Sequence, residues 1–381
     1  MVSEAPAASP PRYEALDALR GICATAVAFF HFAGVSSGEH WAFTRHAWLF
    51  VDFFFVLSGL VIASSYGERL ARGFSPGRFM ALRLGRIYPL HLAVLLAMVA
   101  VECLAMVLSA KGILHREAFA GSTSLAALAG SLGMVHIFGI WPDLVWNGPS
   151  WSIADEIWAY LVFALVCRWA GGRFVAVMAT LALGCALWIA LGGEPWLERT
   201  FWGSLPRCLY GFGLGVAAWR LLSVRSAKGP GFAAATLIEL AVVAGCIAFV
   251  SLGTGPASLL APPLFLIAVL VFAGEAGAIS RLLTTPPLRW LGRLSYSIYM
   301  IHAFLLARIG DVLGMAQHRL GLTLMAPCET LPGFDCFVLT GAQEWALRGG
   351  FLAALLAGSW LAWRLVEEPG RRWSRRRVGI A

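Results

Sequence analysis

Apolar runs long enough to cross a membrane recur along the whole chain, and no other feature restricts its fold as strongly. A hydrocarbon core about 30 Å thick needs roughly 20 consecutive apolar residues in a helix. Only 13% of the 381 residues are charged, about half the share found in ordinary soluble domains. The sequence therefore predicts an all-α integral membrane protein with about ten transmembrane helices. We expect these at residues 15–34, 47–66, 86–109, 151–168, 174–192, 203–221, 232–252, 259–275, 293–311 and 344–365.

The distribution of basic residues orients these spans. If both termini lie in the cytoplasm, twenty of the 29 basic residues fall in cytoplasmic segments and eight in outer ones, in agreement with the positive-inside rule. A further apolar stretch, 125–140, is interrupted by glycines, and a crossing there would place the later basic segments outside. We expect a re-entrant or surface helix instead. The membrane domain is expected at 13–370, between a disordered tail at 1–12 and a basic cytoplasmic tail at 371–381.

Neither the net charge nor the spacing of the cysteines indicates a nucleic-acid or metal site. Membrane orientation explains the charge of +8, so nucleic-acid binding is not expected. Six of the eight cysteines lie within spans at no ligand spacing, and no Cys or His spacing suggests a metal site. Cys328 and Cys336 lie in the loop 312–343, which this topology places outside, where disulfides persist. We predict a structural disulfide between them.

Arg20 and His31 both lie inside the first span. Ionisable residues within a membrane span mark a functional site by default. Eleven residues of helix place the imidazole ~16 Å along the axis from the guanidinium and within ~20° of the same face. The alternative is a snorkelling arginine and a histidine whose hydrogen bonds are satisfied by a neighbouring helix.

Two carboxylates are expected at the depth of His31. The second and fourth spans start on the outer side, so Asp52 and Glu156 lie about as far from the outer surface as His31 does. A carboxylate beside an imidazole orients the ring and stabilises its protonated form. We therefore predict that Asp52 or Glu156 orients His31 as a general base. Glu156 has an alternative role as an acidic residue at a helix N-terminus.

Several short motifs, taken together, resemble the membrane-bound acyltransferase-3 family of integral-membrane O-acyltransferases. They cover nearly the whole chain, and their specificity lies in the set. The early motifs are Leu16-Asp17-Ala18-Leu19-Arg20-Gly21 with ten residues between Arg20 and His31, Asp52-Phe53-Phe54-Phe55-Val56-Leu57-Ser58-Gly59, and Arg83-Leu84-Gly85-Arg86-Ile87-Tyr88-Pro89. The later ones are Trp151-Ser152-Ile153-Ala154-Asp155-Glu156, Ser295-Tyr296-Ser297-Ile298-Tyr299-Met300-Ile301-His302 and Glu368-Pro369.

This resemblance implies an acyl donor, usually acetyl-CoA, that arrives from the cytoplasm, and an acceptor hydroxyl on the far side. It also implies an essential histidine at His31 and functional arginines at Arg83 and Arg86. These two arginines are i, i+3 on one helix face, and arginine binds phosphate bidentately. Arg20, which lies deeper, is expected to hold the pantetheine arm or the thioester end. The alternative explanation of Arg83 and Arg86 is that they are ordinary basic residues at the cytoplasmic end of a span, as the positive-inside rule expects.

Four further residues are candidate substrate contacts, each with a structural alternative. Ser58 can donate to substrate or serve close helix packing with Gly59. Trp151 belongs to a group near the outer face that can stack on a saccharide, although tryptophan also favours membrane interfaces. Tyr299 and His302 share the late helix and either line the same cavity or bond across helices.

We therefore expect a membrane O-acyltransferase in the bacterial inner membrane. It would move an acyl group, expected to be acetyl, from acyl-CoA to a hydroxyl of a cell-surface or exported saccharide. No tightly bound cofactor is expected, since acyl-CoA is a co-substrate. Direct transfer and an acyl-histidine intermediate both stay open. The alternative function is a transporter or flippase of a glycan or small polar solute, in which intramembrane charges would mark a translocation path.

Overall fold

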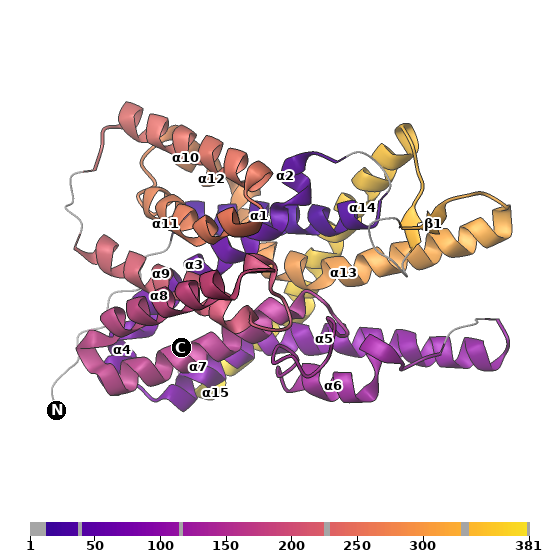
Figure 1. The fold of residues 1–381 in the computed structure, drawn as a ribbon, viewed down its shortest axis with the longest axis horizontal. Coiled ribbons are helices and arrows are strands. Elements are labelled where there is room, and N and C mark those ends of the chain that lie inside the picture. The colour runs from indigo at the N-terminus through magenta and orange to yellow at the C-terminus, as the bar shows by residue number, and fades with distance from the viewer. Residues whose placement is uncertain (1–12, 37–39, 114–116, 225–228, 329–334, 379–381) are drawn as a thin grey trace.

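The computed structural model describes residues 13–36, 40–113, 117–224, 229–328 and 335–378. The predicted tail at 1–12 and the last three residues of the tail at 371–381 lie outside the described residues, while 371–378 are helical. Helices dominate the described part of the chain (Figure 1). They are α1 (Glu14–Gly34), α2 (Ala42–Arg45), α3 (Phe50–Ile62), α4 (Glu68–Ala71), α5 (Pro76–Ala110), α6 (Leu125–Leu132), α7 (Ser150–Ala170), α8 (Phe174–Gly192), α9 (Ser204–Ser223), α10 (Phe232–Leu252), α11 (Ala261–Phe272), α12 (Ala278–Leu283), α13 (Pro286–Leu320), α14 (Ala342–Ala362) and α15 (Glu368–Val378).

Eight continuous helical segments in the described part of the chain are long and apolar enough to cross a membrane. Nine of the ten predicted spans overlap them, because α7 and α8 are joined only by the 3-10 turn Gly171–Arg173 and count as one segment. The remaining predicted span, 203–221, corresponds to α9. This helix is more polar and carries Arg207, and many of its residues are buried. The prediction of an all-α membrane protein is confirmed.

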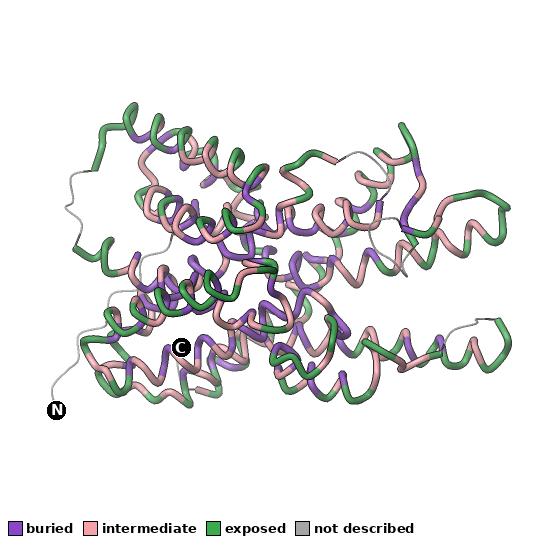
Figure 2. Tube along the Cα trace, in the orientation of Figure 1, coloured by how far each residue is buried: buried purple, intermediate pink, exposed green. Residues whose placement is uncertain are grey.

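The surface pattern agrees with a lipid environment. Figure 2 shows buried residues gathered where the helices cross, whereas much of α10 is exposed. Exposed residues of α10 include Leu237, Leu240 and Ile247, each at least half accessible. In water an apolar face of this kind would promote association. In a bilayer it contacts acyl chains, so the burial pattern supports a multi-pass membrane protein.

The stretch 125–140 does not form a spanning helix. Only α6 is helical there, and eight residues extend about 12 Å. Its end is tied to α5, since the Tyr88 hydroxyl donates to the Leu132 carbonyl (3.0 Å) and His91 Nε2 donates to the Ser131 carbonyl (3.0 Å). The expectation that this stretch does not cross is confirmed.

A small antiparallel sheet follows α13. Strands β1 (Met325–Pro327) and β2 (Asp335–Phe337) pair with Ala326 opposite Cys336. A disulfide joins Cys328 to Cys336, with their Cα atoms 5.0 Å apart. The intervening residues 329–334 lie outside the described part. The sheet and the disulfide hold this loop together, and the Phe337 N–H, which donates to the Val35 carbonyl (2.8 Å), attaches it to the end of α1.

Close contacts at glycine set the positions of α1 and α13. A Cβ on Gly21 would lie 2.6 Å from the Leu291 carbonyl carbon, and one on Gly292 would lie 2.4 Å from the Asp17 carbonyl oxygen. Small residues at such crossings let membrane helices approach backbone to backbone. This crossing brings the motif of the first span, with Arg20 and His31, against the late helix.

A second close crossing joins α3 to α9. A Cβ on Gly59 would lie 2.0 Å from the Phe212 carbonyl oxygen, and one on Gly215 would lie 1.9 Å from the Val56 carbonyl oxygen. Gly59 therefore serves helix packing. Its neighbour Ser58 lies about 100° further round the helix and lines the cavity between the helices.

Candidate active site

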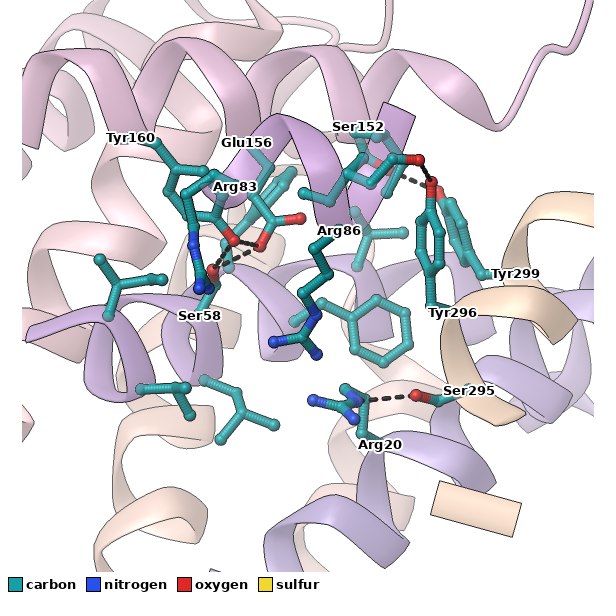
Figure 3. Close-up of a pocket in the computed structure, with 18 residues that line it drawn as sticks. Arg20, Ser58, Arg83, Arg86, Ser152, Glu156, Tyr160, Ser295, Tyr296 and Tyr299 are labelled. Carbon is teal, nitrogen blue, oxygen red and sulfur yellow. Dashed lines mark hydrogen bonds between the residues drawn. The ribbon is translucent and has the colours of Figure 1, made fainter. Parts of the chain in front are cut away.

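A cavity lies between α1, α3, α5, α7 and α13 (Figure 3). It holds about 820 Å³ of empty volume, counting the part open to solvent. Apolar side chains of α3 form much of its wall. Its polar lining consists of Arg20, Ser58, Arg83, Arg86, Ser152, Glu156, Tyr160, Ser295, Tyr296 and Tyr299.

Three guanidinium groups point into this cavity, from α1 and α5 (Figure 3). Arg20 Nε donates to Ser295 Oγ (2.7 Å), and its Nη2 lies 3.3 Å from Asp17 Oδ1. Arg83 Nη2 donates to the Tyr66 hydroxyl (3.2 Å), whereas its Nε is buried with no partner among the described residues. Arg86 extends into the middle of the cavity. This arrangement favours a ligand with several negative charges.

Glu156 is the only carboxylate among the described residues that line the cavity. Its Oε1 accepts hydrogen bonds from both Ser58 Oγ and the Tyr160 hydroxyl, and these two hydroxyl oxygens lie 3.0 Å apart. The three groups come from α3 and α7. They form a compact hydrogen-bonded cluster beside Arg83 (Figure 3).

His31 contacts a second histidine. Its Nδ1 lies 3.0 Å from the Val27 carbonyl oxygen and 3.2 Å from His302 Nε2, and the two ring centroids are 4.7 Å apart. A carbonyl oxygen can only accept, so Nδ1 carries the proton in the bond to Val27. His31 Nε2 then holds the lone pair of a neutral imidazole.

Tyr299 connects the cavity to this histidine pair. Its ring lies 5.7 Å from the His302 ring, and its hydroxyl is 2.8 Å from Ser152 Oγ. Tyr299 lines the cavity, while His31 and His302 stand one layer behind it. The structure thus brings Arg20, Arg83, Arg86, Ser58, Glu156 and Tyr299 to one cavity, with His302 and His31 beside it.

The predicted contact between Asp52 and His31 is wrong. Asp52 is fully buried, and its two oxygens accept from Arg207 Nε (3.0 Å) and Nη2 (2.7 Å). This bidentate pair joins α3 to α9, and it takes the carboxylate away from the imidazole. The predicted contact between Glu156 and His31 is also wrong, because Glu156 bonds to Ser58 and Tyr160.

Trp151 does not line the cavity, contrary to its expected role as a substrate contact. Its ring lies 5.2 Å from the Arg207 guanidinium, and Trp48 lies at the same distance from that group. Trp151 is also only 6% exposed. The ring therefore covers the buried ion pair, as expected for a cation–π contact.

Sequence reasoning missed two groups of residues. Arg207 falls inside the predicted span 203–221, and nothing local to it indicates its partner 155 residues earlier. Tyr160 and Tyr296 line the cavity, and both were within reach of the sequence. Tyr160 is i+4 from Glu156, and Tyr296 belongs to the same motif as Tyr299. In the described part of the chain, no group of three or more His, Cys, Asp or Glu side chains could hold a metal ion.

Comparisons with known proteins place this chain. A family model described as an acyltransferase domain (acyltransferase-3) matches residues 13–376. "Protein 2 in picA locus" of Rhizobium radiobacter is 32% identical over 186 residues, 46% of this chain and 91% of that protein. Acyltransferase MdmB of Streptomyces mycarofaciens is 26% identical over 87% of this chain and 82% of its own length.

A third relative is longer than this chain. YrhL of Bacillus subtilis, named as a candidate peptidoglycan O-acetyltransferase, is 26% identical over 75% of this chain and 47% of its own length. No solved structure matches. Because the family model covers nearly all of the chain, and because two of these relatives carry acyltransferase names, the protein belongs to the acyltransferase-3 family of membrane acyltransferases.

Proposed function

We propose that this membrane acyltransferase moves an acetyl group from acetyl-CoA, bound from the cytoplasm, to a hydroxyl of an exported or cell-surface saccharide. The observation that carries the proposal is the order of groups in the site. Three guanidiniums line the cavity, Tyr299 lines it as well, and the His302–His31 pair stands directly behind Tyr299. The bacterial inner membrane is the compartment that provides acetyl-CoA on one side and envelope saccharides on the other.

The arginines suit the donor. Coenzyme A carries several phosphate charges, and arginine holds phosphate through bidentate bonds without losing its own charge. Arg83 and Arg86 come from the first three turns of α5, which would lie on the cytoplasmic side in the predicted topology. Arg20, anchored by Ser295 and Asp17, would hold the pantetheine arm. A donor phosphate would also bond the buried Arg83 Nε.

His31 supplies the base in this proposal. Its Nε2 would take the proton of the acceptor hydroxyl as the hydroxyl oxygen attacks the thioester carbonyl carbon. The C–S bond then breaks, and the coenzyme A sulfur leaves with the proton that His31 carries. Attack by Nε2 itself, to form an acyl-histidine that the acceptor then cleaves, balances equally well. His302 in either route holds the His31 ring in place.

The acceptor class rests on the relatives. One is named as a candidate peptidoglycan O-acetyltransferase and another as an acyltransferase. A saccharide hydroxyl as acceptor also agrees with what the resemblance to the family implies. Family membership also favours the enzyme over the transporter alternative, for which intramembrane charges were the main argument.

The test is transfer of label from [¹⁴C-acetyl]-CoA to muropeptides by purified protein in nanodiscs. We expect His31→Ala to lower transfer by about 10²–10⁴-fold, the range for loss of a general acid–base group. His318→Ala, at the exposed end of α13, is the matched control and should keep wild-type transfer. Wild-type transfer by folded His31→Ala would remove this residue from the mechanism. Unmodified saccharide moving across vesicles, with no label transferred, would support the transporter instead.

A further inference from the structure

A second pocket lies beyond the histidine pair, between α5, α13 and the segment 119–147. It holds about 470 Å³ of empty volume, counting the part open to solvent. Its lining residues are Met98, Val101, Glu102, Thr123, Trp146, Asn147, Ala303, Phe304, Ala307 and Arg308. Neither His31 nor any of the three cavity arginines is among them.

The order of residues along two helices relates this pocket to the active site. On α13, Tyr296 and Tyr299 line the first cavity, and His302 contacts His31. Further along the same helix, four residues line the second pocket: Ala303, Phe304, Ala307 and Arg308. On α5, Arg83 and Arg86 line the first cavity. Met98, Val101 and Glu102 line the second pocket, more than about 15 Å further along the helix by its rise per residue. The histidine pair therefore stands between the two spaces. Figure 1 shows both helices running on past the rest of the bundle on this side.

Two side chains that line this pocket each have one atom without a hydrogen-bond partner among the described residues. Asn147 is 1% exposed, and its Nδ2 donates to the Met300 carbonyl (3.0 Å), while its Oδ1 has no partner among the described residues. Arg308 Nη2 is held by Asp311 (3.0 Å), whereas its buried Nε has no partner in the same set. Buried polar atoms are almost always hydrogen-bonded. Two residues that line this pocket thus each hold an unsatisfied polar atom, one acceptor and one donor.

The remaining lining narrows the chemistry of that ligand. Trp146 and Phe304 provide aromatic surface, which packs against the C–H face of a sugar ring. Glu102 is a carboxylate, and its Oε2 already accepts from Phe119 N–H (3.0 Å). A carboxylate here, with a single arginine already paired to Asp311, disfavours a phosphate. An acyl chain would leave Asn147 Oδ1 and Arg308 Nε unsatisfied, whereas sugar hydroxyls both donate and accept.

We propose that this pocket binds a pyranose ring of the acceptor saccharide and presents its hydroxyl to the His31–His302 pair from the side opposite to acyl-CoA. This assignment rests on the proposed function. Donor and acceptor then approach the imidazoles from two separate spaces along α5 and α13. Acceptor choice is set by Trp146, Asn147, Phe304 and Arg308, and donor choice by the arginine-lined cavity.

Binding of the saccharide to this pocket can be tested independently of acyl transfer. Ala307 is exposed at the rim, so Ala307→Cys in a Cys103→Ser background will react with a soluble maleimide. We expect a disaccharide muropeptide, free or on a polyprenyl carrier, to slow this reaction at least fivefold, while coenzyme A leaves it unchanged. Protection by coenzyme A alone, or by neither compound, overturns the assignment. Protection only by the carrier-linked form identifies a lipid-linked acceptor at the same pocket.

Kinetics supply the second test. We expect Arg308→Gln to raise the KM for the muropeptide about tenfold or more, as for loss of a hydrogen bond from a charged donor. The KM for acetyl-CoA and acceptor-independent acetyl-CoA hydrolysis should change less than twofold. Arg319→Gln, exposed near the end of α13, is the matched control. A rise in the acetyl-CoA KM alone contradicts the proposal. Absence of transfer by the wild type, together with saccharide protection of Ala307→Cys, would refute the proposed function and leave the saccharide pocket standing.

Discussion

Two clusters of charge lie within this helical bundle, and they differ in how they are satisfied. In the first, Asp52 and Arg207 bond each other through two contacts between two tryptophan rings, and both side chains are at most 1% exposed. In the second, Arg20, Arg83 and Arg86 face an open cavity in which Glu156 is the only lining carboxylate among the described residues. A charge paired inside the protein holds helices together. A charge left facing a cavity is available to a ligand.

This difference predicts opposite responses to loss of one arginine. In the paired cluster, removing Arg207 leaves a buried, uncompensated carboxylate. In the open cluster, Arg86 interacts electrostatically with Glu156 and Glu367 but forms no ion pair at contact distance with a described residue, so its removal disturbs the fold far less. Stability and activity should therefore separate cleanly between the two regions.

The largest effect is expected for Arg207→Met. Loss of one partner of a buried ion pair costs about 3–5 kcal/mol, so the unfolding midpoint of the purified protein should fall steeply. The double variant Asp52→Leu/Arg207→Met should recover most of that loss, because no unpaired charge remains. Unfolding followed by far-UV circular dichroism in increasing denaturant measures all three proteins. If Arg207→Met is as stable as the wild type but inactive, the Asp52–Arg207 pair takes part in the reaction and does not serve to hold the helices together.

A smaller effect, on binding alone, is expected for Arg86→Gln. The KM for acetyl-CoA should rise about ten- to a hundredfold, the range for a hydrogen bond to a charged group, with a much smaller loss of stability than in Arg207→Met. Arg168→Gln, exposed near the end of α7, is the control. Acetyl-pantetheine, which lacks the phosphates, sharpens the test because its KM should not respond to the Arg86 change. An equal rise for both donors would move Arg86 to the thioester end.

The smallest effect is expected for Glu156→Gln. Its carboxylate fixes the hydroxyls of Ser58 and Tyr160, and a glutamine oxygen can keep accepting from them while the negative charge is lost. We expect a drop in kcat of about tenfold with little change in stability, and Glu117→Gln at an exposed position serves as the control. Steady-state kinetics separate the outcomes, since a rise in KM alone would indicate uniform binding. If the unfolding midpoint falls as far as in Arg207→Met, Glu156 instead holds the helices together, as the Asp52–Arg207 pair does.

Helix positions were largely predictable, while helix ends were less so. The first span was expected at 15–34 and is Glu14–Gly34, and the seventh was expected at 232–252 and is Phe232–Leu252. By contrast, α5 and α13 each extend to 35 residues, well past the predicted 86–109 and 293–311. Hydropathy reports only the part of a helix that lies in the hydrocarbon core. The polar ends continue as helix because the backbone gains hydrogen bonds there as well.

The candidate site was predictable in its members but not in its pairings. Arg20, Arg83, Arg86, Ser58 and Tyr299 were singled out from local motifs, and all of them line one cavity. Depth arguments placed Asp52, Glu156 and His31 at one level. They could not say which of these side chains face each other, since depth leaves the rotation of each helix open.

The sequence by itself determined that this chain is an all-α membrane protein of the acyltransferase-3 type, and it identified most of the chemistry-bearing residues. Those properties depend on apolar runs and short motifs, whose spacing along a helix follows from a fixed rise and turn. Only the tertiary structure decided that Asp52 belongs to Arg207, Glu156 to Ser58 and Tyr160, and His31 to His302. Each of these long-range partnerships depends on how closely two helices cross and which faces they turn to each other, and small residues such as Gly59 and Gly292 set those crossings far from the charges themselves.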